Sequence, residues 1–151
     1  MLHPARSAVQ DPLGGYRLDI RESIDRIFSQ KTRLTDRFYE VFLDRYPEVK
    51  PYFEGADLEA QSVMLTMALG AVREHPEIKN AFREYLRVLG TKHKRKGIPK
   101  ELYPKFLEAL LATLEEFHGD DWDENLARQW TDAVQDASEL MFEGYGERFH
   151  I

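Results

Sequence analysis

Apolar side chains recur every three or four residues along most of this chain, which is the spacing of one face of an α-helix. The first such stripe consists of Leu18, Ile20, Ile24, Ile27 and Phe28. The seven prolines and nine glycines stand mostly at the expected ends of such stretches. No run of four to eight residues alternates strictly between apolar and polar side chains with β-branched enrichment. The pattern therefore predicts an all-α chain of six to eight helices.

Helix boundaries follow from capping residues and prolines. Thr32 and Asp57 suit the N-cap position, and Pro47 suits the first turn of a short helix. Pro76 interrupts the pattern, which resumes two residues later. Residues 1–17 contain few large apolar groups, so we expect an N-terminal extension followed by one domain over residues 18–151. Helices are expected to begin at Leu18, at about Thr32, after Asp57 and at about Asp123, with a short helical turn at Pro47, and two further helices are expected over residues 78–93 and 102–117.

Composition excludes several classes of function. The chain of 151 residues has a formal net charge of −6, which argues against a nucleic-acid partner. No stretch approaches the roughly 18 consecutive apolar residues that span a bilayer, and the first residues lack the apolar run of a secretory signal. The chain has no cysteine, so a metal would be held by histidine or carboxylate. We expect a cytoplasmic protein with no membrane partner.

His93 is the strongest candidate metal ligand among the five histidines. It ends an amphipathic helix, and a turn and a strongly apolar helix containing Tyr103 follow it. His75 and His118 stand at expected helix ends, where a histidine interacts favourably with the helix dipole. A lone histidine beside an apolar face is more often structural than metal-binding, so the residues around His93 must decide its role.

Two stretches carry a resemblance to a known family, LTDRFYEVFLDRYPEVKPYF (34–53) and LGTKHKRKGIPKELYPKFLEALLATL (89–114). They resemble the single-domain and flavohaemoglobin-like branch of the bacterial globins. The resemblance covers roughly three quarters of the chain. It implies a globin fold for residues 18–151, packed around one b-type haem.

The resemblance also implies a role for several residues. His93 would be the proximal iron ligand, with Tyr103 beside it at the family's spacing of ten residues. Tyr39 would be the distal tyrosine, Pro47 would open the short third helix, and Phe53 would stack on the haem. The presence of all five residues in this order makes the signal specific.

The distal side of the haem would be completed by residues of the next helix. The resemblance implies that Gln61 is the distal glutamine and that Leu65, one turn later, lies over the iron. Bound oxygen would accept hydrogen bonds from the Tyr39 hydroxyl and the Gln61 amide, worth on the order of 1–3 kcal/mol. Phe53, Leu65 and Phe106 would form dry walls that limit oxidation of the iron.

The run Lys92-His93-Lys94-Arg95-Lys96 has two interpretations that the sequence leaves open. A solvated basic corner is the common meaning of such a run. Haem propionates, however, carry two negative charges near the proximal edge, so Lys92 and Arg95 are also candidate counter-ions.

One position departs from the pattern of the family. In flavohaemoglobin-like globins a glutamate of the last helix joins the proximal histidine and tyrosine in a network. An alignment on Trp130 places Tyr145 near that position, with Glu143 and Glu147 two residues to either side. Glu139 and Glu143 are candidates if the register is shifted. Without a carboxylate the imidazole has less anionic character.

The resemblance favours reversible binding of oxygen, nitric oxide or carbon monoxide, for transport, storage or scavenging. A nitric oxide dioxygenase that depends on a separate reductase is an alternative, because no glycine-rich nucleotide motif follows a strand. A haem-based gas sensor and a haemless helical interaction module are further alternatives. Enzymatic activity is therefore an open question at this point, with a non-enzymatic gas binder expected.

Overall fold

The computed structural model describes residues 9–10, 16–30, 33–73 and 79–146. Two 3₁₀ helices, η1 (Pro47–Phe53) and η2 (Gly119–Asp121), connect longer helices. The expectation of an all-α chain is confirmed. None of the helices in these ranges has the length and apolar character that a bilayer crossing requires. The α-helices are α1 (Ile20–Ser29), α2 (Arg33–Arg45), α3 (Leu58–Arg73), α4 (Lys79–Arg95), α5 (Leu102–His118) and α6 (Glu124–Tyr145).

Aspartate caps begin three of these helices. The side chains of Asp19, Asp57 and Asp123 each accept a hydrogen bond from a backbone N–H two or three residues later, at 2.8–3.0 Å. Pro47 opens η1 as predicted. The predicted cap at Thr32 and the predicted break at Pro76 lie outside the described residues.

Two short strands lie within the predicted N-terminal extension. β1 (Val9–Gln10) pairs antiparallel with β2 (Tyr16–Arg17). The sequence predicted no strand here, because alternation is recognisable only over runs of four or more residues and each of these strands has two.

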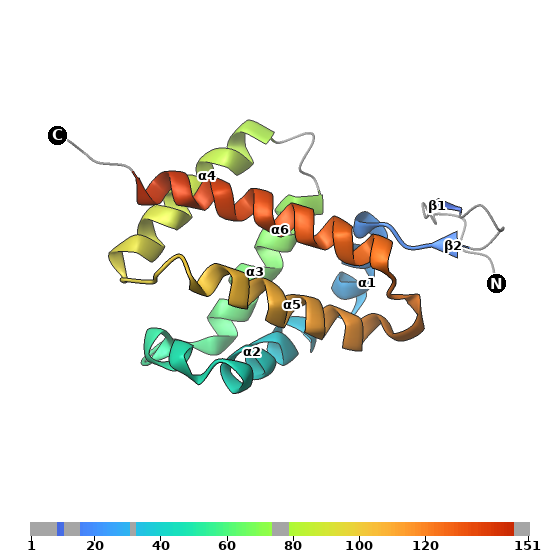
Figure 1. Ribbon diagram of the computed structural model, residues 1–151, viewed down its shortest axis with the longest axis horizontal. Helices are drawn as coiled ribbons and strands as arrows, with labels where there is room; N and C mark the ends of the chain where they lie inside the picture. Colours follow the sequence, from blue (N-terminus) through green and yellow to red (C-terminus); the bar gives the residue numbers. More distant parts are fainter. Residues whose placement is uncertain (1–8, 11–15, 31–32, 74–78, 147–151) are drawn as a thin grey trace.

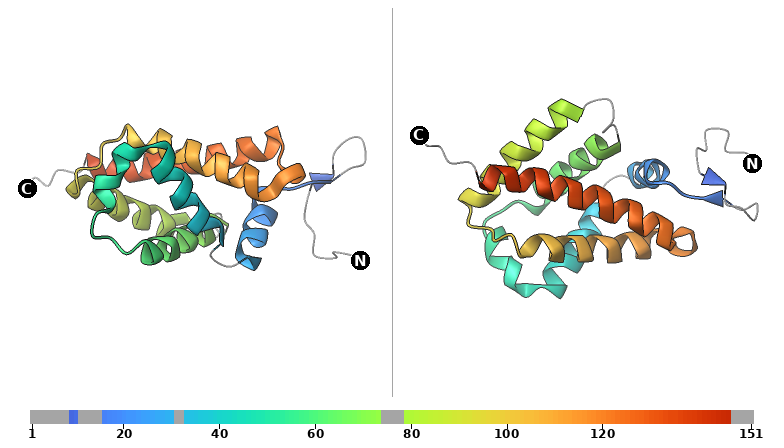
Figure 2. Two further views of the ribbon diagram at one scale, coloured as in Figure 1. Left: turned by 90° about the horizontal axis from the view of Figure 1, so that it is seen from below. Right: turned by 45° about the horizontal axis from the view of Figure 1, so that its top comes forward.

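The helices pack on one another in several pairs. α5 and α6 lie side by side along the long axis of the molecule, α2 packs on α5, and α4 crosses α6 (Figures 1 and 2). α3 packs on α1 and α2. Close packing between α3 and α4 does not occur among the described parts of these helices. α3 is therefore held in place by α1 and α2, and α4 is held in place by α6.

α4 and α6 cross with their backbones in contact. A Cβ atom at Gly90 would overlap the backbone of Met141, and a Cβ atom at Gly144 would overlap the backbone of α4. The Thr91 hydroxyl donates a hydrogen bond across the crossing to the Gly144 carbonyl, at 3.3 Å. Only glycine permits this approach, which holds α4 against α6 three residues before His93.

Three buried polar side chains tie α1 to α5 and α6. The Ser23 hydroxyl lies 2.7 Å from His118 Nε2 and accepts a hydrogen bond from Trp130 Nε1 at 3.0 Å. His118 Nδ1 is buried and has no hydrogen-bond partner among the described residues. Burial lowers the pKa of His118 to about 4; Arg26 adds to this effect and Asp121 opposes it. His118 ends α5 as expected, but it is a neutral core residue rather than an exposed partner of the helix dipole.

We expect Gly90→Ala to lower the free energy of unfolding by about 2 kcal/mol, because the added methyl group must push α4 away from α6. Gly70→Ala on α3 is the matched control. Its Cβ would lie 3.4 Å from the Phe28 ring, an ordinary contact, so its better helix propensity should leave stability equal or raised. Urea unfolding followed by circular dichroism measures both variants. Wild-type stability of Gly90→Ala would contradict the close crossing.

His118 should make the fold sensitive to acid. Its pKa of about 4 in the folded state lies below the value of 6.5 for an unperturbed histidine, so the unfolded chain takes up a proton first as the pH falls. The free energy of unfolding should therefore decrease by up to about 3 kcal/mol between these two pH values. His118→Gln removes the titrating group and should lose this part of the decrease. Urea titrations at about pH 7.5 and about pH 4.5 measure it, and an equal decrease in both proteins would exclude His118 as the cause.

Candidate functional site

His93 lies in the last turn of α4 and is half-buried. Its Nδ1 is 2.9 Å from the Leu89 carbonyl oxygen, which can only accept, so the ring proton is on Nδ1. Nε2 therefore presents its lone pair and has no hydrogen bond with any described residue. Burial lowers the pKa of His93, which favours the neutral imidazole. A neutral imidazole oriented by a backbone carbonyl is the form that ligates metals.

Two tyrosines connect the end of α4 to α6. The Tyr145 hydroxyl donates to the Ile98 carbonyl at 2.7 Å, so its oxygen accepts the hydrogen bond from the Tyr103 hydroxyl at 3.2 Å. The Ile98 N–H in turn donates to the His93 carbonyl at 3.1 Å. Burial, with a smaller contribution from the hydrogen bond, raises the pKa of Tyr103, so this network is neutral. The Tyr103 ring lies beside the His93 ring, with the centroids 6.1 Å apart.

The glutamates that were candidates for this network are elsewhere. Glu143 is exposed and forms ion pairs with Arg83 and Arg87 at 3.5 Å. Glu139 is exposed, and Glu147 lies outside the described residues. Within the ranges that the structure describes, the network beside the histidine contains no carboxylate.

The predicted distal aromatic residues form one cluster. Tyr39 of α2 meets the edge of Phe53, at the end of η1, with 5.7 Å between ring centroids. Phe106 of α5 packs on Phe38 and Phe42, with centroid distances of 4.8 and 5.8 Å. Phe38 also contacts Tyr39, at 4.9 Å, and this completes the cluster. The structure thus brings three of the predicted site residues together from three different elements.

Tyr39 is a buried tyrosine with an unused hydroxyl. Only 8% of its surface is exposed, and no described residue forms a hydrogen bond with its hydroxyl group. Burial raises the pKa of Tyr39 to about 12, so the hydroxyl keeps its proton at neutral pH. The residue can therefore donate a hydrogen bond to a ligand.

Gln61 and Leu65 lie one turn apart on α3. Leu65 is partly buried against the core cluster that also contains Tyr39, Phe53 and Phe106. Gln61 is half-buried, and its amide group forms no hydrogen bond within the described chain, with Tyr39 or with any other residue. Leu65 thus joins the predicted site directly, whereas Gln61 has no hydrogen bond to a described residue of it.

The apolar residues divide into two clusters. Tyr39, Phe53 and Leu65 belong to the large one, whereas Tyr103 and Leu89 belong to a small one between α4 and α6. Six of the seven large apolar side chains that are exposed in the described part of the chain lie on α3 and α4. They are Leu58, Val63, Met64, Met67, Tyr85 and Val88. Apolar surface of this kind marks a binding site, and haem is a flat, largely apolar group.

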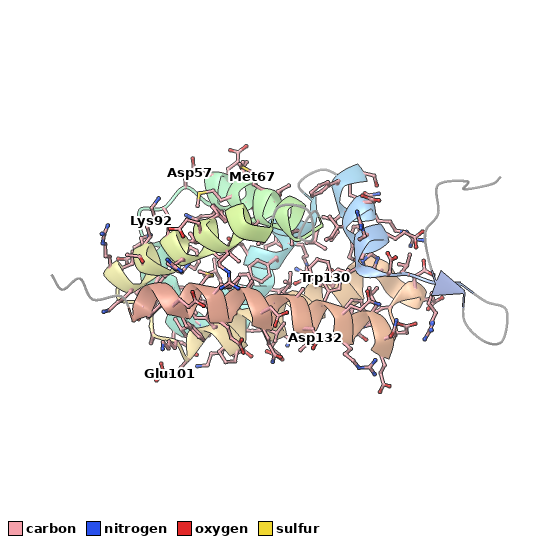
Figure 3. All side chains as sticks on the ribbon, turned by 90° about the horizontal axis from the view of Figure 1, so that it is seen from above. Asp57, Met67, Lys92, Glu101, Trp130 and Asp132 are labelled. Atoms are coloured by element: carbon pink, nitrogen blue, oxygen red, sulfur yellow. The ribbon has the colours of Figure 1, made fainter. Side chains whose placement is uncertain are left out.

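The two predicted counter-ions, Lys92 and Arg95, are exposed on α4. Figure 3 shows Lys92 at the surface of the helix that carries His93. Neither side chain forms an ion pair with a described residue, so both are available to an anion.

A comparison with known protein families identifies the family of this chain. A model of the globin family matches residues 36–141, which is more than half of the chain. The chain belongs to the globin family. The resemblance drawn from the sequence is thereby confirmed, and membership of this family implies haem binding.

Several individual proteins are similar to this globin. An uncharacterised globin-like protein of Aquifex aeolicus is 28% identical over 97 residues, which cover 64% of this chain and 69% of the relative. Leghemoglobin-1 of Lupinus luteus is 26% identical over 135 residues, covering 81% and 88%. A flavohemoprotein of Schizosaccharomyces pombe is 32% identical over 99 residues, but these cover 64% of this chain and only 23% of the relative.

Solved structures give the same result. An engineered carbene transferase made from a putative nitric oxide dioxygenase of Rhodothermus marinus superposes with a TM-score of 0.73 and 25% identity, covering 83% of this globin and 89% of that chain. A protein of Pseudomonas aeruginosa described as structurally highly homologous to a human haemoglobin has a TM-score of 0.70 and 25% identity, covering 85% and 100%. The globin fold expected from the sequence is therefore confirmed.

Sequence reasoning missed two features of the site in this globin. It did not recognise that Gly90 and Gly144 bring α4 onto α6, although both glycines interrupt helical patterns without a turn signal. It placed Tyr145 near the family's glutamate but could not show that its hydroxyl bonds Ile98. Such bonds depend on the path of the chain after α4, which no local pattern determines.

Proposed function

We propose that this globin holds haem b through Nε2 of His93 and reversibly binds oxygen or another diatomic gas. The observation that carries the proposal is the hydrogen bond from His93 Nδ1 to the Leu89 carbonyl. It fixes the tautomer, leaves Nε2 as the only free donor atom of a neutral imidazole, and orients the ring.

The residues of the chain would have separate tasks around the haem. The haem would supply an iron atom with a coordination position for a diatomic gas. On the distal side the Tyr39 hydroxyl, with its unused proton, would donate a hydrogen bond to the gas, and the Gln61 amide is the second donor proposed. Phe53, Leu65 and Phe106 would exclude water from that side.

Lys92 and Arg95 would form ion pairs with the haem propionates. Both side chains are exposed on the helix of the proposed ligand, and neither is engaged by a described carboxylate. Ion pairs between these two cations and the two haem carboxylates would strengthen haem binding beyond the bond at Nε2. They would also favour one orientation of the haem in the site.

The neutral proximal network favours reversible binding. His93 donates to a backbone carbonyl, and Tyr103 donates to Tyr145 rather than to a carboxylate. Among the described residues the imidazole therefore has no anionic partner that would increase electron donation to the iron. This supports a carrier, store or scavenger of gas over chemistry on the bound gas.

A nitric oxide dioxygenase that works with a separate reductase is the second candidate. It is favoured by the similarity to a structure described as a putative nitric oxide dioxygenase. Stopped-flow measurement of nitric oxide consumption, with and without a reductase, distinguishes sustained turnover from a single equivalent of reaction with each bound oxygen.

Replacing the proposed ligand should remove the haem. We expect purified His93→Ala to lack the intense Soret absorption of the wild type, because alanine offers no donor to the iron. His118→Gln is the control, since it changes a histidine outside the site, and it should keep the band. Added imidazole should restore the band in His93→Ala. A normal Soret band without imidazole would place the iron on another side chain.

The distal hydroxyl should slow the release of oxygen. We expect Tyr39→Phe to increase the oxygen dissociation rate constant about ten- to hundredfold, the equivalent of one hydrogen bond to a partly charged acceptor. Stopped-flow displacement of oxygen by carbon monoxide measures this rate constant. Tyr52→Phe, which removes a hydroxyl from η1, should behave like the wild type. An unchanged rate in Tyr39→Phe would remove Tyr39 from the distal role.

A further inference from the structure

Positive charge is concentrated at one corner of this acidic globin. The chain contains 27 acidic and 21 basic residues, excluding histidine. The ten residues 92–101 nevertheless contain five basic side chains, and Glu101 is their single carboxylate. The basic corner consists of Lys92, Lys94, Arg95, Lys96 and Lys100.

The side chains of the basic corner are not neutralised within the described chain. All five are exposed, and none of them forms an ion pair with a described carboxylate. Arginines elsewhere behave differently: Arg37, Arg45 and Arg87 each bind a glutamate of their own or a neighbouring helix. Lys100 contacts only the faces of two aromatic rings of α6, with its Nζ 4.9 and 5.7 Å from their centroids.

The basic corner lies directly beside the proposed haem ligand. Lys92 and Lys94 are the neighbours of His93 in the chain, and Lys96 is close enough to contribute to the lowered pKa of His93. In Figure 1 this end of α4 lies at the opposite end of the molecule from α1. A partner that docks here would thus sit near the haem and far from the Ser23–His118–Trp130 cluster.

We propose that the basic corner is the docking surface for an acidic flavoprotein that supplies single electrons to the haem. This inference depends on the haem binding proposed above. In the step, the reduced flavin of the partner would lose one electron and a ferric haem iron held by His93 would gain it to become ferrous, and no bond in this chain would form or break. The partner thereby returns the oxidised globin to the form that binds oxygen.

Two observations point to this partner. The first is charge: exposed lysines at a rim raise the association rate with an oppositely charged protein and contribute little lasting affinity, as brief electron-transfer encounters require. The second is the similarity to a flavohemoprotein, whose name joins a flavin to a haem and of which this globin spans only 23%. This likeness supports a flavin as the electron source of the partner.

The test uses the haem-loaded globin and an acidic bacterial flavodoxin as the electron donor. Stopped-flow mixing of reduced flavodoxin with the ferric globin under carbon monoxide gives the second-order rate constant of haem reduction. We expect this constant to decrease at least about tenfold between low and high salt, and Lys94→Glu/Lys96→Glu to be at least about tenfold slower than the wild type at low salt. At high salt the rate constants of the wild type and of Lys94→Glu/Lys96→Glu should become equal.

The matched control is Arg21→Glu/Arg128→Glu. It changes the formal charge by the same amount through exposed residues of α1 and of the first half of α6. It should reduce the rate constant much less. Equal rates for the two double variants, or a salt-independent rate, would overturn the docking surface while the Soret band still reports bound haem. Loss of that band in the wild type would instead contradict the proposed function.

A different anionic partner would also overturn the proposal. Duplex DNA and vesicles containing phosphatidylserine serve as probes in co-sedimentation with the wild type and with Lys94→Glu/Lys96→Glu. Binding of either probe that depends on these lysines, at physiological salt, would assign the corner to that class of ligand. We expect no such binding, because the remainder of the chain is acidic.

Discussion

The hydrogen bond between His93 Nδ1 and the Leu89 carbonyl is the interaction on which the site depends. It lies within one turn of α4, so it needs no distant partner, and it determines which nitrogen can bind a metal. The orientation of the imidazole then follows the orientation of α4. Gly90 and Gly144 set that orientation by bringing the backbones of α4 and α6 together. The position of the proposed ligand thus depends on two glycines, because any side chain at Gly90 or Gly144 would separate the two helices.

The proposed distal side is held together in a different way. Its residues come from α2, η1, α3 and α5, and they are held by aromatic packing rather than by hydrogen bonds. Tyr39 is buried in this packing, its hydroxyl has no hydrogen-bond partner among the described residues, and burial keeps that hydroxyl protonated. An apolar wall that carries a proton donor can discriminate between gases that do and do not accept a hydrogen bond.

Much of this molecule is predictable from its sequence. The helices follow from apolar spacing, and the cap at Asp57 follows from local chemistry. His93 and Tyr39 are candidates for the site because they stand in the expected order within a resemblance to a family. Long-range features were less accessible: the bond from Tyr145 to Ile98 and the burial of His118 depend on how distant segments meet. The pair of short strands fell below the length at which a pattern can be recognised.

The division of the apolar residues into two clusters has a consequence for assembly. The large cluster joins α1, α2, α5 and α6 without α4, whereas the small one holds α4 on α6. A polypeptide emerging from the ribosome can therefore complete most of its interior before any prosthetic group arrives. Haem bound as proposed would add contacts between the two clusters, and the gain in stability would rise with the concentration of free haem. The supply of haem would in this way affect the lifetime of the protein in the cell.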